Sequence, residues 1–383
     1  MAQQFFIPSK IITGKNALEA AGDSIGSMGK KALIVCGPNV LKIGVTKKIV
    51  VELEKRGISY AIYSDITGEP TDEMIDGGAE IYKKESCDFL IGVGGGSSLD
   101  AIKAIALKAV CGGEMSDYMG VSVEEKLPPM AAIPTTAGTG SEATQFTIIT
   151  DTKNDVKMLL KGESFMPDLA VIDPAFTFTA PPGVTASTGL DALTHAIEAY
   201  TSKKAQPLTD IFAVSAVRRI FKNLPAAYED GKNSSAREEM SLAALEAGIA
   251  FNNASVTIVH GMSRPIGALF HVPHGTSNAI LLYPCLKYVA DGAVDRFAVL
   301  GRETGAASDE DNDAAAAEKF IEAVQELCRK CGIGKPDVYG IKEEEFLKAV
   351  PKMADDAVAS GSPANTRKEV KKEDIIRIYQ SLW

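Results

Sequence analysis

The sequence predicts a two-domain protein, in which a Rossmann-like α/β domain with a parallel sheet precedes a domain made of helices only. In the first half, short apolar runs alternate with segments of helical period, the pattern of parallel strands joined by crossover helices. After the double proline Pro181-Pro182, strand-like runs largely disappear and Ala-rich helical stretches dominate. The length of 383 residues also exceeds what one hydrophobic core usually supports. We therefore place the domain boundary at the double proline.

The first domain, residues 1–182, is predicted to bind a dinucleotide. Its strands are predicted to be KKALIVCG, ISYAIYSD, CDFLIGVGGG, MAAIP and LAVIDP. The helices that follow the first three strands are predicted to be VTKKIVVELEKRG, TDEMIDGGAEIYKKES and SSLDAIKAIALKAV. A hairpin is expected between the last two strands. Short links between these elements favour right-handed crossovers around one parallel sheet.

The second domain, residues 183–383, is predicted to be all-helical. Its helical segments include GLDALTHAIEAYTS, LTDIFAVSAVRRIFKNL, AREEMSLAALEAGIAFNN, DAAAAEKFIEAVQELCRK and KKEDIIRIYQSLW. These runs carry apolar residues at helical spacing and lack the β-branched runs of buried strands. We expect this domain to hold the catalytic site.

The composition indicates a cytoplasmic globular protein. Hydrophobic residues make up 45% of the chain, and 40 basic against 50 acidic residues give a net charge of −10. No basic block is visible, which argues against a nucleic-acid partner. No apolar run reaches the roughly 18–20 residues of a membrane span. The start, MAQQFFIPSK, lacks the layout of a signal peptide.

The six cysteines are scattered, so free thiols are expected. Cys328 and Cys331 form a CxxC motif, which could be redox-active or half of a zinc site. No second closely spaced pair accompanies it, and a helical segment ends at Gly332, directly after the motif. We interpret the motif as two thiols in the last turn of a helix.

Two polar loops predict a phosphate-binding edge of the sheet. The first loop, residues 94–98 (GGGSS), joins a strand to a helix, where free N–H groups and the helix dipole attract phosphate. It matches neither the GxGxxG fingerprint nor a P-loop, and alone it could be a tight turn. The second loop, residues 134–141 (PTTAGTGS), also follows a strand and offers four hydroxyls. Together the two loops predict a clamp on one extended phosphate ligand.

The four histidines of the chain predict a metal site. Asp191 and His195 are four residues apart in a helical segment, so they share one face. His260, His271 and His274 lie within one short stretch. Three imidazoles and a carboxylate suit Fe2+ or Zn2+ better than calcium or magnesium. Each of these residues also has a simpler explanation: Asp191 and His195 could be a helix-surface pair, His260 a core histidine and His274 a turn residue. His271 could line a pocket or be a histidine packed on the surface.

Taken together, the motifs resemble those of the iron-containing (group III) alcohol dehydrogenase family. They span the chain as SKIITGK, GVGGGSSLDAIKA, AIPTTAGTGSEAT, TGLDALTHAIEAY, HGMSRPIGALFHVPHG and IIRIYQSLW. The resemblance implies NAD- or NADP-dependent interconversion of a small aldehyde and its alcohol, in a cleft between the two domains. It also implies a homo-oligomer, commonly a dimer.

The resemblance implies a role for particular residues. The implied metal ligands are Asp191, His195, His260 and His274, for Fe2+ with Zn2+ as the alternative, and the ion would act as a Lewis acid. The implied cofactor residues are Gly37, Gly94, Gly95, Gly96, Ser97, Ser98, Asp100, Thr135, Thr136, Thr139 and the ribose-binding position Lys157. The substrate-pocket candidates are Phe251, Arg264 and His271.

One departure from the family pattern concerns the substrate. Relatives frequently have a second histidine four residues after the one that matches His260, whereas this chain has Arg264. A guanidinium is well shaped for carboxylate, sulfonate or phosphate, so we expect a small aldehyde with an anionic end. Alternatively, Arg264 pairs with a protein carboxylate or the cofactor, and the substrate is a neutral alcohol or diol of the propanediol or glycerol type. A more distant alternative is a non-catalytic nucleotide-binding module.

The other departure concerns the coenzyme. Gly37 follows the first predicted strand, where many NAD-preferring relatives have an aspartate that repels the 2′-phosphate of NADP. Glycine removes that repulsion, but no basic residue adjoins it to favour NADP. Both coenzymes therefore remain open.

Overall fold

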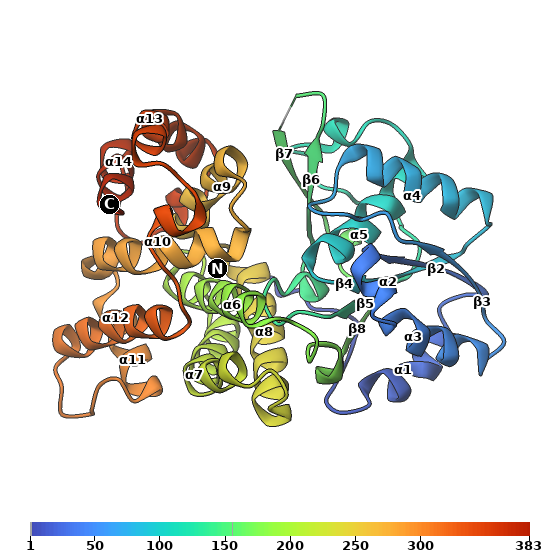
Figure 1. Cartoon of the computed structure of the whole chain (residues 1–383), viewed down its shortest axis with the longest axis horizontal. Coiled ribbons are helices and arrows are strands. Elements are labelled where there is room, and N and C mark those ends of the chain that lie inside the picture. The colour runs from blue at the N-terminus through green and yellow to red at the C-terminus, as the bar shows by residue number, and fades with distance from the viewer. Residues whose placement is uncertain (1, 155) are drawn as a thin grey trace. The chain divides into compact units, whose positions relative to one another are not determined.

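The computed structural model describes residues 2–154 and 156–383, which form two compact units (Figure 1). The α/β unit comprises Phe6–Thr179, and the helical unit comprises Ala180–Trp383 together with the few residues before Phe6. The predicted boundary at Pro181-Pro182 thus lies close to the division of the chain. The predicted fold class, a parallel-sheet domain followed by a helical one, is confirmed.

The N-terminal residues were assigned to the wrong unit by the sequence pattern. Phe5 stacks on Phe212, with ring centroids 6.0 Å apart. The backbone carbonyl of Gln4 accepts a hydrogen bond of 3.0 Å from the side-chain amide of Gln206. A short extended segment has no periodicity of its own, so only these tertiary contacts reveal where it packs.

A six-stranded sheet forms the centre of the α/β unit, with all pairs parallel and the order β1-β8-β5-β4-β2-β3. The strands are β1 (Lys10–Thr13), β2 (Lys31–Cys36), β3 (Ser59–Tyr63), β4 (Phe89–Gly94), β5 (Met130–Pro134) and β8 (Leu169–Ile172). Strands β2, β4 and β5 are buried almost throughout, as their continuous apolar runs predict. Strand β1 was not predicted, because it has only four residues and its outer two are exposed at the sheet edge.

Helices cover both faces of this sheet. One face packs against α1 (Ala17–Gly26) and α3 (Val45–Glu54), and the other against α4 (Asp72–Lys84) and α5 (Gly96–Cys111). The remaining elements of the unit are the short helix α2 (Pro38–Lys42) and the antiparallel hairpin of β6 (Phe146–Asp151) and β7 (Val156–Lys161). The hairpin confirms the one expected before β8, and the sheet places the ends of β4 and β5 side by side.

The helical unit contains nine α-helices among its described residues and no β-strand beyond an isolated bridge. The helices are α6 (Pro182–Thr201), α7 (Pro207–Glu229), α8 (Ser234–Ala254), α9 (Ile258–Phe270), α10 (His274–Val289), α11 (Val294–Thr304), α12 (Asp313–Lys330), α13 (Glu343–Ala359) and α14 (Lys372–Gln380). Helix α6 packs against α7, α8 and α10. Every residue from Gly189 to Thr201 is buried, so polar side chains on this helix must find partners inside the unit.

Among the described residues, no single helix is both long and apolar enough to cross a membrane. Helices α8 and α9 reach the length and apolarity of a membrane span only when they are taken together, and they are bent by 105° relative to each other.

The CxxC motif lies at the end of α12, and both of its thiols are free and buried. Burial raises the pKa of Cys328 to about 12 and that of Cys331 to about 11. Because the thiolate is the reactive form, these thiols are poorly suited to redox chemistry. The structure therefore agrees with the interpretation as two thiols at a helix end.

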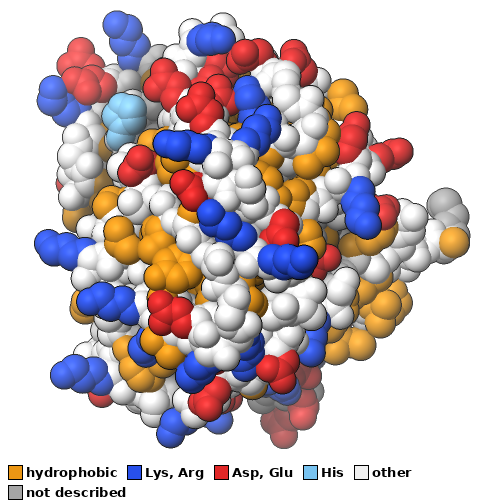
Figure 2. Space-filling view, turned by 90° about the vertical axis from the view of Figure 1, so that its right-hand side faces the viewer, with side chains coloured by type: hydrophobic (Ala, Val, Ile, Leu, Met, Phe, Trp, Pro, Cys, Tyr) orange, Lys and Arg blue, Asp and Glu red, His pale blue; other side chains and the backbone are white. Residues whose placement is uncertain are grey.

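Charged side chains of both signs are mixed on the face of the molecule drawn in Figure 2. Oppositely charged side chains of the α/β unit form ion pairs, such as Lys31 with Glu85 at 2.9 Å and Arg56 with Asp23 at 3.0 Å. Exposed pairs of this kind contribute little to stability. The stability of the α/β unit therefore comes mainly from the apolar layers on either side of its sheet.

Candidate metal centre and nucleotide loops

Three helices of the helical unit bring the predicted metal ligands together. Asp191 and His195 lie one turn apart on α6, His260 lies in the first turn of α9, and His274 is the first residue of α10. The side chains of Asp191, His195 and His260 are 2%, 6% and 3% exposed, whereas that of His274 is 35% exposed. Three of the four candidate ligands are therefore held inside the core, and the fourth borders its surface.

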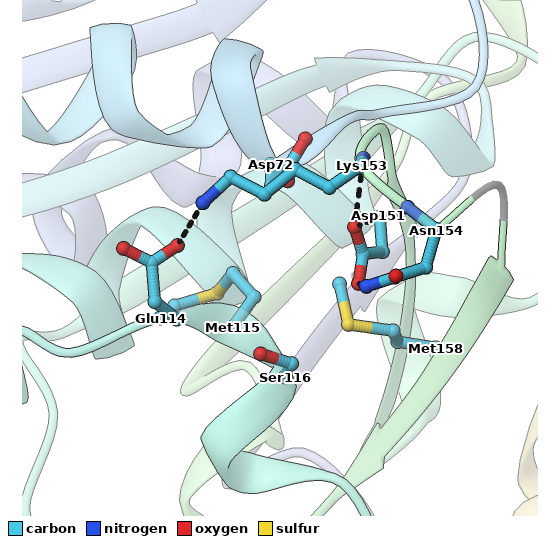
Figure 3. A pocket seen from close by; sticks show the side chains of 8 residues that line it. All are labelled: Asp72, Glu114, Met115, Ser116, Asp151, Lys153, Asn154 and Met158. Atoms are coloured by element: carbon cyan, nitrogen blue, oxygen red, sulfur yellow. Dashed lines mark hydrogen bonds and ion pairs between the residues drawn. The ribbon is translucent and has the colours of Figure 1, made fainter.

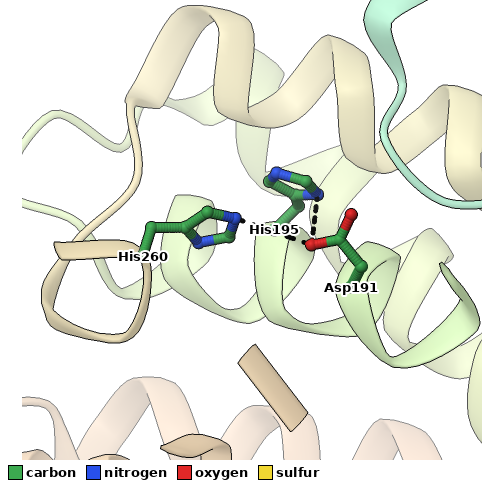
Figure 4. Close-up of side chains that lie close together, drawn as sticks. All are labelled: Asp191, His195 and His260. Atoms are coloured by element: carbon green, nitrogen blue, oxygen red, sulfur yellow. Dashed lines mark ion pairs between the residues drawn. The ribbon is translucent and has the colours of Figure 1, made fainter. Parts of the chain in front are cut away.

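The imidazoles surround a single oxygen, Oδ1 of Asp191 (Figure 4). Nδ1 of His195 lies 3.8 Å from it, and the Nε2 atoms of His260 and His274 lie 3.7 and 3.8 Å from it. Asp191, His195 and His260 offer ligand atoms that all lie within 4.8 Å of one another. Ligands about 2.0–2.2 Å from one tetrahedral ion are about 3.4 Å apart, so these spacings suit a metal ion.

The electrostatics of the cluster also favour a cation. Asp191 and Glu198 are buried carboxylates whose described ion pairs are with histidines only. Burial alone would raise the pKa of Asp191, but His195 and the other two imidazoles hold it well below its usual range. Burial lowers the pKa of His195 to about 3, so its ring is neutral, and among the described residues its buried Nδ1 has no hydrogen-bond partner. A neutral His195 ring beside two buried carboxylates fits the donor set of a divalent transition metal.

Asn278, which the sequence did not single out, contacts three of the four predicted ligands. Its amide nitrogen lies 2.7 Å from Oδ1 of Asp191, 3.1 Å from Nε2 of His260 and 3.2 Å from Nε2 of His274. It lies one turn after His274 on α10, a spacing that could have indicated a shared helix face. Asn278 thus gathers ligand atoms from three helices around one point.

Glu198 is a second residue that sequence reasoning missed. Its carboxylate is 1% exposed and lies 2.6 Å from Nδ1 of His260, the nitrogen that does not face Asp191. Burial would raise the pKa of Glu198, but His260 and Thr257 together lower it. The spacing of three residues after His195 was a signal, because it places Glu198 on the ligand-bearing side of α6.

The three substrate-pocket candidates lie in different surroundings. The Phe251 ring stacks on His195, with centroids 4.1 Å apart and an interplanar angle of 15°. Arg264 donates a hydrogen bond of 3.2 Å to Ser362 Oγ, and it does not appear in the ion pairs of the described residues. Burial lowers the pKa of Arg264, and Glu198 acts in the opposite direction. His271 is exposed within its unit at the end of α9, with a φ of 55°, and its role stays a prediction.

In the α/β unit, the two predicted phosphate loops lie side by side. Gly94 at the end of β4 is aligned with Pro134 at the end of β5, and its carbonyl accepts a hydrogen bond of 2.9 Å from the Thr135 N–H. A Cβ on Gly96 would lie 2.9 Å from the Thr139 side chain. Gly94 itself has a φ of 152°, and a Cβ there would lie 2.5 Å from Ser98 Oγ. Small residues are therefore needed where the loops meet, and Thr135, Thr136 and Thr139 adjoin the first turn of α5.

Two side chains of α5, the partly buried Asp100 and the fully buried Lys103, hold the second loop in place. Both carboxylate oxygens of Asp100 are engaged within the unit, one by Ser141 Oγ and the other by the Ile148 N–H at 3.0 Å. Lys103 is fully buried and donates to the backbone carbonyls of Ser141 and Thr144, at 2.8 and 2.9 Å. We interpret Asp100 as a support of the loop, although it was predicted among the cofactor residues.

Gly37 and Lys157, the residues predicted to face the adenosine ribose, have protein neighbours. A Cβ on Gly37 would lie 2.8 Å from the backbone carbonyl oxygen of Ile66. Lys157 Nζ pairs with Glu69 at 2.6 Å. The segment that contains Ile66 and Glu69 therefore limits the space at position 37 and neutralises Lys157.

Replacing Gly37 with alanine is expected to destabilise the protein by about 1–3 kcal/mol, because a methyl group would press against a backbone carbonyl. Gly68→Ala is the matched control from the same segment, since nothing lies within 4 Å of its added Cβ. The control is expected to be neutral or slightly stabilising. Urea unfolding measures the free energy of unfolding of both variants. Equal values would contradict the prediction and show that the segment around Ile66 moves to accommodate the methyl group at little cost.

A small hollow beside the β6–β7 hairpin is lined by a mixture of acidic, basic, neutral polar and methionine side chains (Figure 3). Asp151 accepts a hydrogen bond of 2.9 Å from the Lys153 N–H, and Lys153 Nζ reaches Glu114 at 3.4 Å. Asp72 accepts from both the backbone and the hydroxyl of Thr152. These carboxylates stabilise the turn of the hairpin, and they do not form a second metal cluster of the kind seen around Asp191.

Known proteins with the same organisation are similar to this chain over its full length. A model described as iron-containing alcohol dehydrogenase matches residues 8–174, and one for the C-terminal region of that family matches residues 185–383. An NAD-dependent methanol dehydrogenase of Bacillus methanolicus is 37% identical over 364 residues, covering 94% of this chain and 95% of the relative.

Solved structures agree with these matches. A crystal structure of 1,3-propanediol oxidoreductase superposes with a TM-score of 0.97 at 34% identity and covers 100% of both chains. Sulfoacetaldehyde reductase from Bifidobacterium kashiwanohense, solved in complex with NAD+, superposes with a TM-score of 0.88 at 28% identity, covering 100% of this chain and 99% of the other.

Proposed function

Because the chain belongs to the iron-containing alcohol dehydrogenase family, we propose that it reduces a small aldehyde with an anionic end to the alcohol, and catalyses the reverse reaction. The broader activity, oxidoreduction at a CH–OH group, follows from the family and from relatives that are alcohol dehydrogenases. A non-catalytic nucleotide-binding module therefore loses its support. The proposal adds the substrate class, the ligand set and the role of Arg264.

The observation that carries the proposal is the convergence of imidazole nitrogens on one carboxylate oxygen, Oδ1 of Asp191. We propose Asp191, His195, His260 and His274 as the ligands of Fe2+, with Zn2+ as the alternative, since both ions accept mixed nitrogen and oxygen donors. NAD and NADP both remain candidates for the coenzyme. Glycine at position 37 offers no charge against a 2′-phosphate, and Lys157 already has a partner in Glu69.

The side chains of this chain bind and orient the reactants. When bound, the ion polarises the substrate oxygen as a Lewis acid, and the nicotinamide supplies or accepts the hydride. Phe251 covers one face of the His195 ring and restricts its rotation. The loops after β4 and β5 offer backbone N–H groups and hydroxyls to the diphosphate. Arg264 would hold the anionic end of the substrate and so orient its carbonyl group.

The anionic substrate is supported by the surroundings of Arg264. This side chain is partly buried, and its described hydrogen bond goes to a neutral hydroxyl, that of Ser362. A partly buried charge without a close counter-ion is unfavourable, and a bound carboxylate, sulfonate or phosphate would compensate it. The sulfoacetaldehyde reductase that superposes on this chain shows that the fold accommodates a sulfonated aldehyde in that protein.

Replacing Arg264 with glutamine is expected to lower kcat/KM for an anionic aldehyde by about 10- to 100-fold, since a hydrogen bond to a charged group contributes about 1.5–3 kcal/mol. Activity on a neutral aldehyde of similar size is expected to change little. Arg264→Lys is the charge-preserving control and should retain part of the preference. The assay uses sulfoacetaldehyde and propanal, each with NADH and with NADPH.

An equal loss on both aldehydes would contradict the anionic substrate and favour the second candidate, a neutral alcohol or diol of the propanediol type. That candidate is supported by the relatives named for methanol and 1,3-propanediol. It is also consistent with the longer-range interaction of Arg264 with Glu198, which could serve the protein alone. Loss of metal without loss of activity would contradict both candidates.

A further inference from the structure

Glu198 joins the ligand-bearing helix α6 to the first turn of α9. It lies seven residues after Asp191, two helical turns along the same side of α6. Its side chain is 1% exposed. An ionised carboxylate at such a position must be fully hydrogen-bonded, because an unpaired buried charge is very costly.

Three donors of one short segment satisfy this carboxylate. Oε1 accepts from Thr257 Oγ1 at 2.8 Å and from the Val259 N–H at 2.6 Å, and Oε2 faces His260 Nδ1 at 2.6 Å. The first N–H groups of a helix have no partner within it, and the positive end of the helix dipole favours a carboxylate. Glu198 therefore caps α9 from another helix and binds the first-turn histidine at the same time.

The contact with His260 determines which nitrogen of that ring carries the proton. A carboxylate accepts hydrogen bonds, so Nδ1 must be the donor, and the lone pair of a neutral ring is then on Nε2. Nε2 is the atom that lies 3.7 Å from Asp191 Oδ1, among the other predicted ligand atoms. Glu198 thus leaves the correct nitrogen of His260 available for a metal ion.

We propose that Glu198 is a positioning residue, which fixes the tautomer and the orientation of His260 for metal binding. This inference rests on the proposed function, because it assumes that the cluster around Asp191 holds the metal. The contact resembles the carboxylate–histidine pairs that orient metal ligands in many proteins, whose loss typically lowers metal affinity 10- to 100-fold. Glu198 does not contact the ion in this proposal.

The substitution Glu198→Gln tests the proposal with almost no change in shape. The glutamine oxygen can still accept from Thr257 and Val259, but its NH2 group would face His260 Nδ1 and favour the wrong tautomer. We expect the Kd for Co2+, titrated into metal-free protein and followed by visible absorption, to rise about 10- to 100-fold. Activity at saturating Co2+ is expected to recover in large part, whereas a purely structural defect would persist.

Two control variants separate this role from others. Thr257→Val removes one hydrogen bond to Glu198 Oε1 but leaves the contacts of Glu198 with the Val259 N–H and with His260. Its Kd for Co2+ should therefore change far less than that of Glu198→Gln. Glu246→Gln is the matched control on α8, where the carboxylate pairs with Arg219 at 3.1 Å, and it should leave the Kd unchanged. Equal losses of affinity in the Thr257 and Glu198 variants would overturn the proposal, because the Thr257 variant keeps the contact between Glu198 and His260.

A measurement on the unaltered protein keeps the proposal testable even if the glutamine variant folds poorly. The chain has four histidines, so 15N NMR of histidine-labelled, Zn2+-loaded protein can report each tautomer. His260 is expected to be protonated at Nδ1, and protonation at Nε2 would overturn the proposal. If the unaltered protein takes up no stoichiometric Co2+, the proposed metal site itself fails. If the unaltered protein binds Co2+ and Glu198→Gln binds it equally tightly, the metal site stands and only the proposed role of Glu198 fails.

Discussion

Replacing Asp191 with alanine is expected to abolish stoichiometric metal binding and to lower kcat/KM at least about 1000-fold, since a Lewis acid contributes several kcal/mol to the transition state. The reason lies in the position of its Oδ1 atom. The nitrogens of His195, His260 and His274 all face this one oxygen at 3.7–3.8 Å, and Asn278 also donates to it. Among the described ion pairs, no other carboxylate oxygen faces all three rings, since Glu198 reaches that of His260 alone.

Metal analysis after purification under anaerobic conditions measures the first effect, and a coupled assay with an aldehyde panel measures the second. Asp374→Ala is a suitable control, because this carboxylate is also buried in the helical unit but accepts hydrogen bonds at the start of α14. The control should lose stability and keep its metal. Full metal content in Asp191→Ala, or activity that survives its loss, would contradict the proposed centre.

Much of the fold could be predicted because its signals are local. The buried strands β2, β4 and β5 have continuous apolar runs, and the glycines after β4 mark the turn into α5. The pair of Asp191 and His195 was visible because i and i+4 residues share a helix face. In contrast, β1 is short and half exposed, so neither its period nor its apolarity could distinguish it from a loop.

The supporting residues of the site could not be assigned because their partners are distant in sequence. Glu198 contacts His260 across 62 residues, and Asn278 contacts Asp191 across 87. In the sequence each is a single polar residue within a helical segment. Such a residue could equally well face solvent, where water would satisfy its hydrogen bonds. Lys103 is similar, since a lysine within the apolar run of α5 gives no sign of the acceptors that surround it. Only the packing of helices shows that these side chains face inward.

Replacing Lys103 with methionine is expected to destabilise the protein by about 3–5 kcal/mol, which is the usual cost of removing one partner from a buried charged network. Its ammonium group is fully buried and lies 2.8–2.9 Å from the backbone carbonyls of Ser141, Thr144 and Phe146. Methionine fills similar space but donates no hydrogen bond, so three inward-facing carbonyls would lose their donor. The second phosphate loop should therefore loosen, and affinity for NADH and NADPH should fall together.

Lys108→Met is the matched control, from the same helix α5. Lys108 pairs with Asp76 at 2.7 Å, but Asp76 is 47% exposed, and such a pair contributes about 0–1 kcal/mol. Hydrogen exchange of residues 135–148 is the direct measurement, because opening of the loop exposes its amides. We expect these amides to exchange faster in Lys103→Met than in Lys108→Met. Equal protection in both variants would contradict the prediction and mean that Asp100 and the backbone contacts of the loop hold it without Lys103.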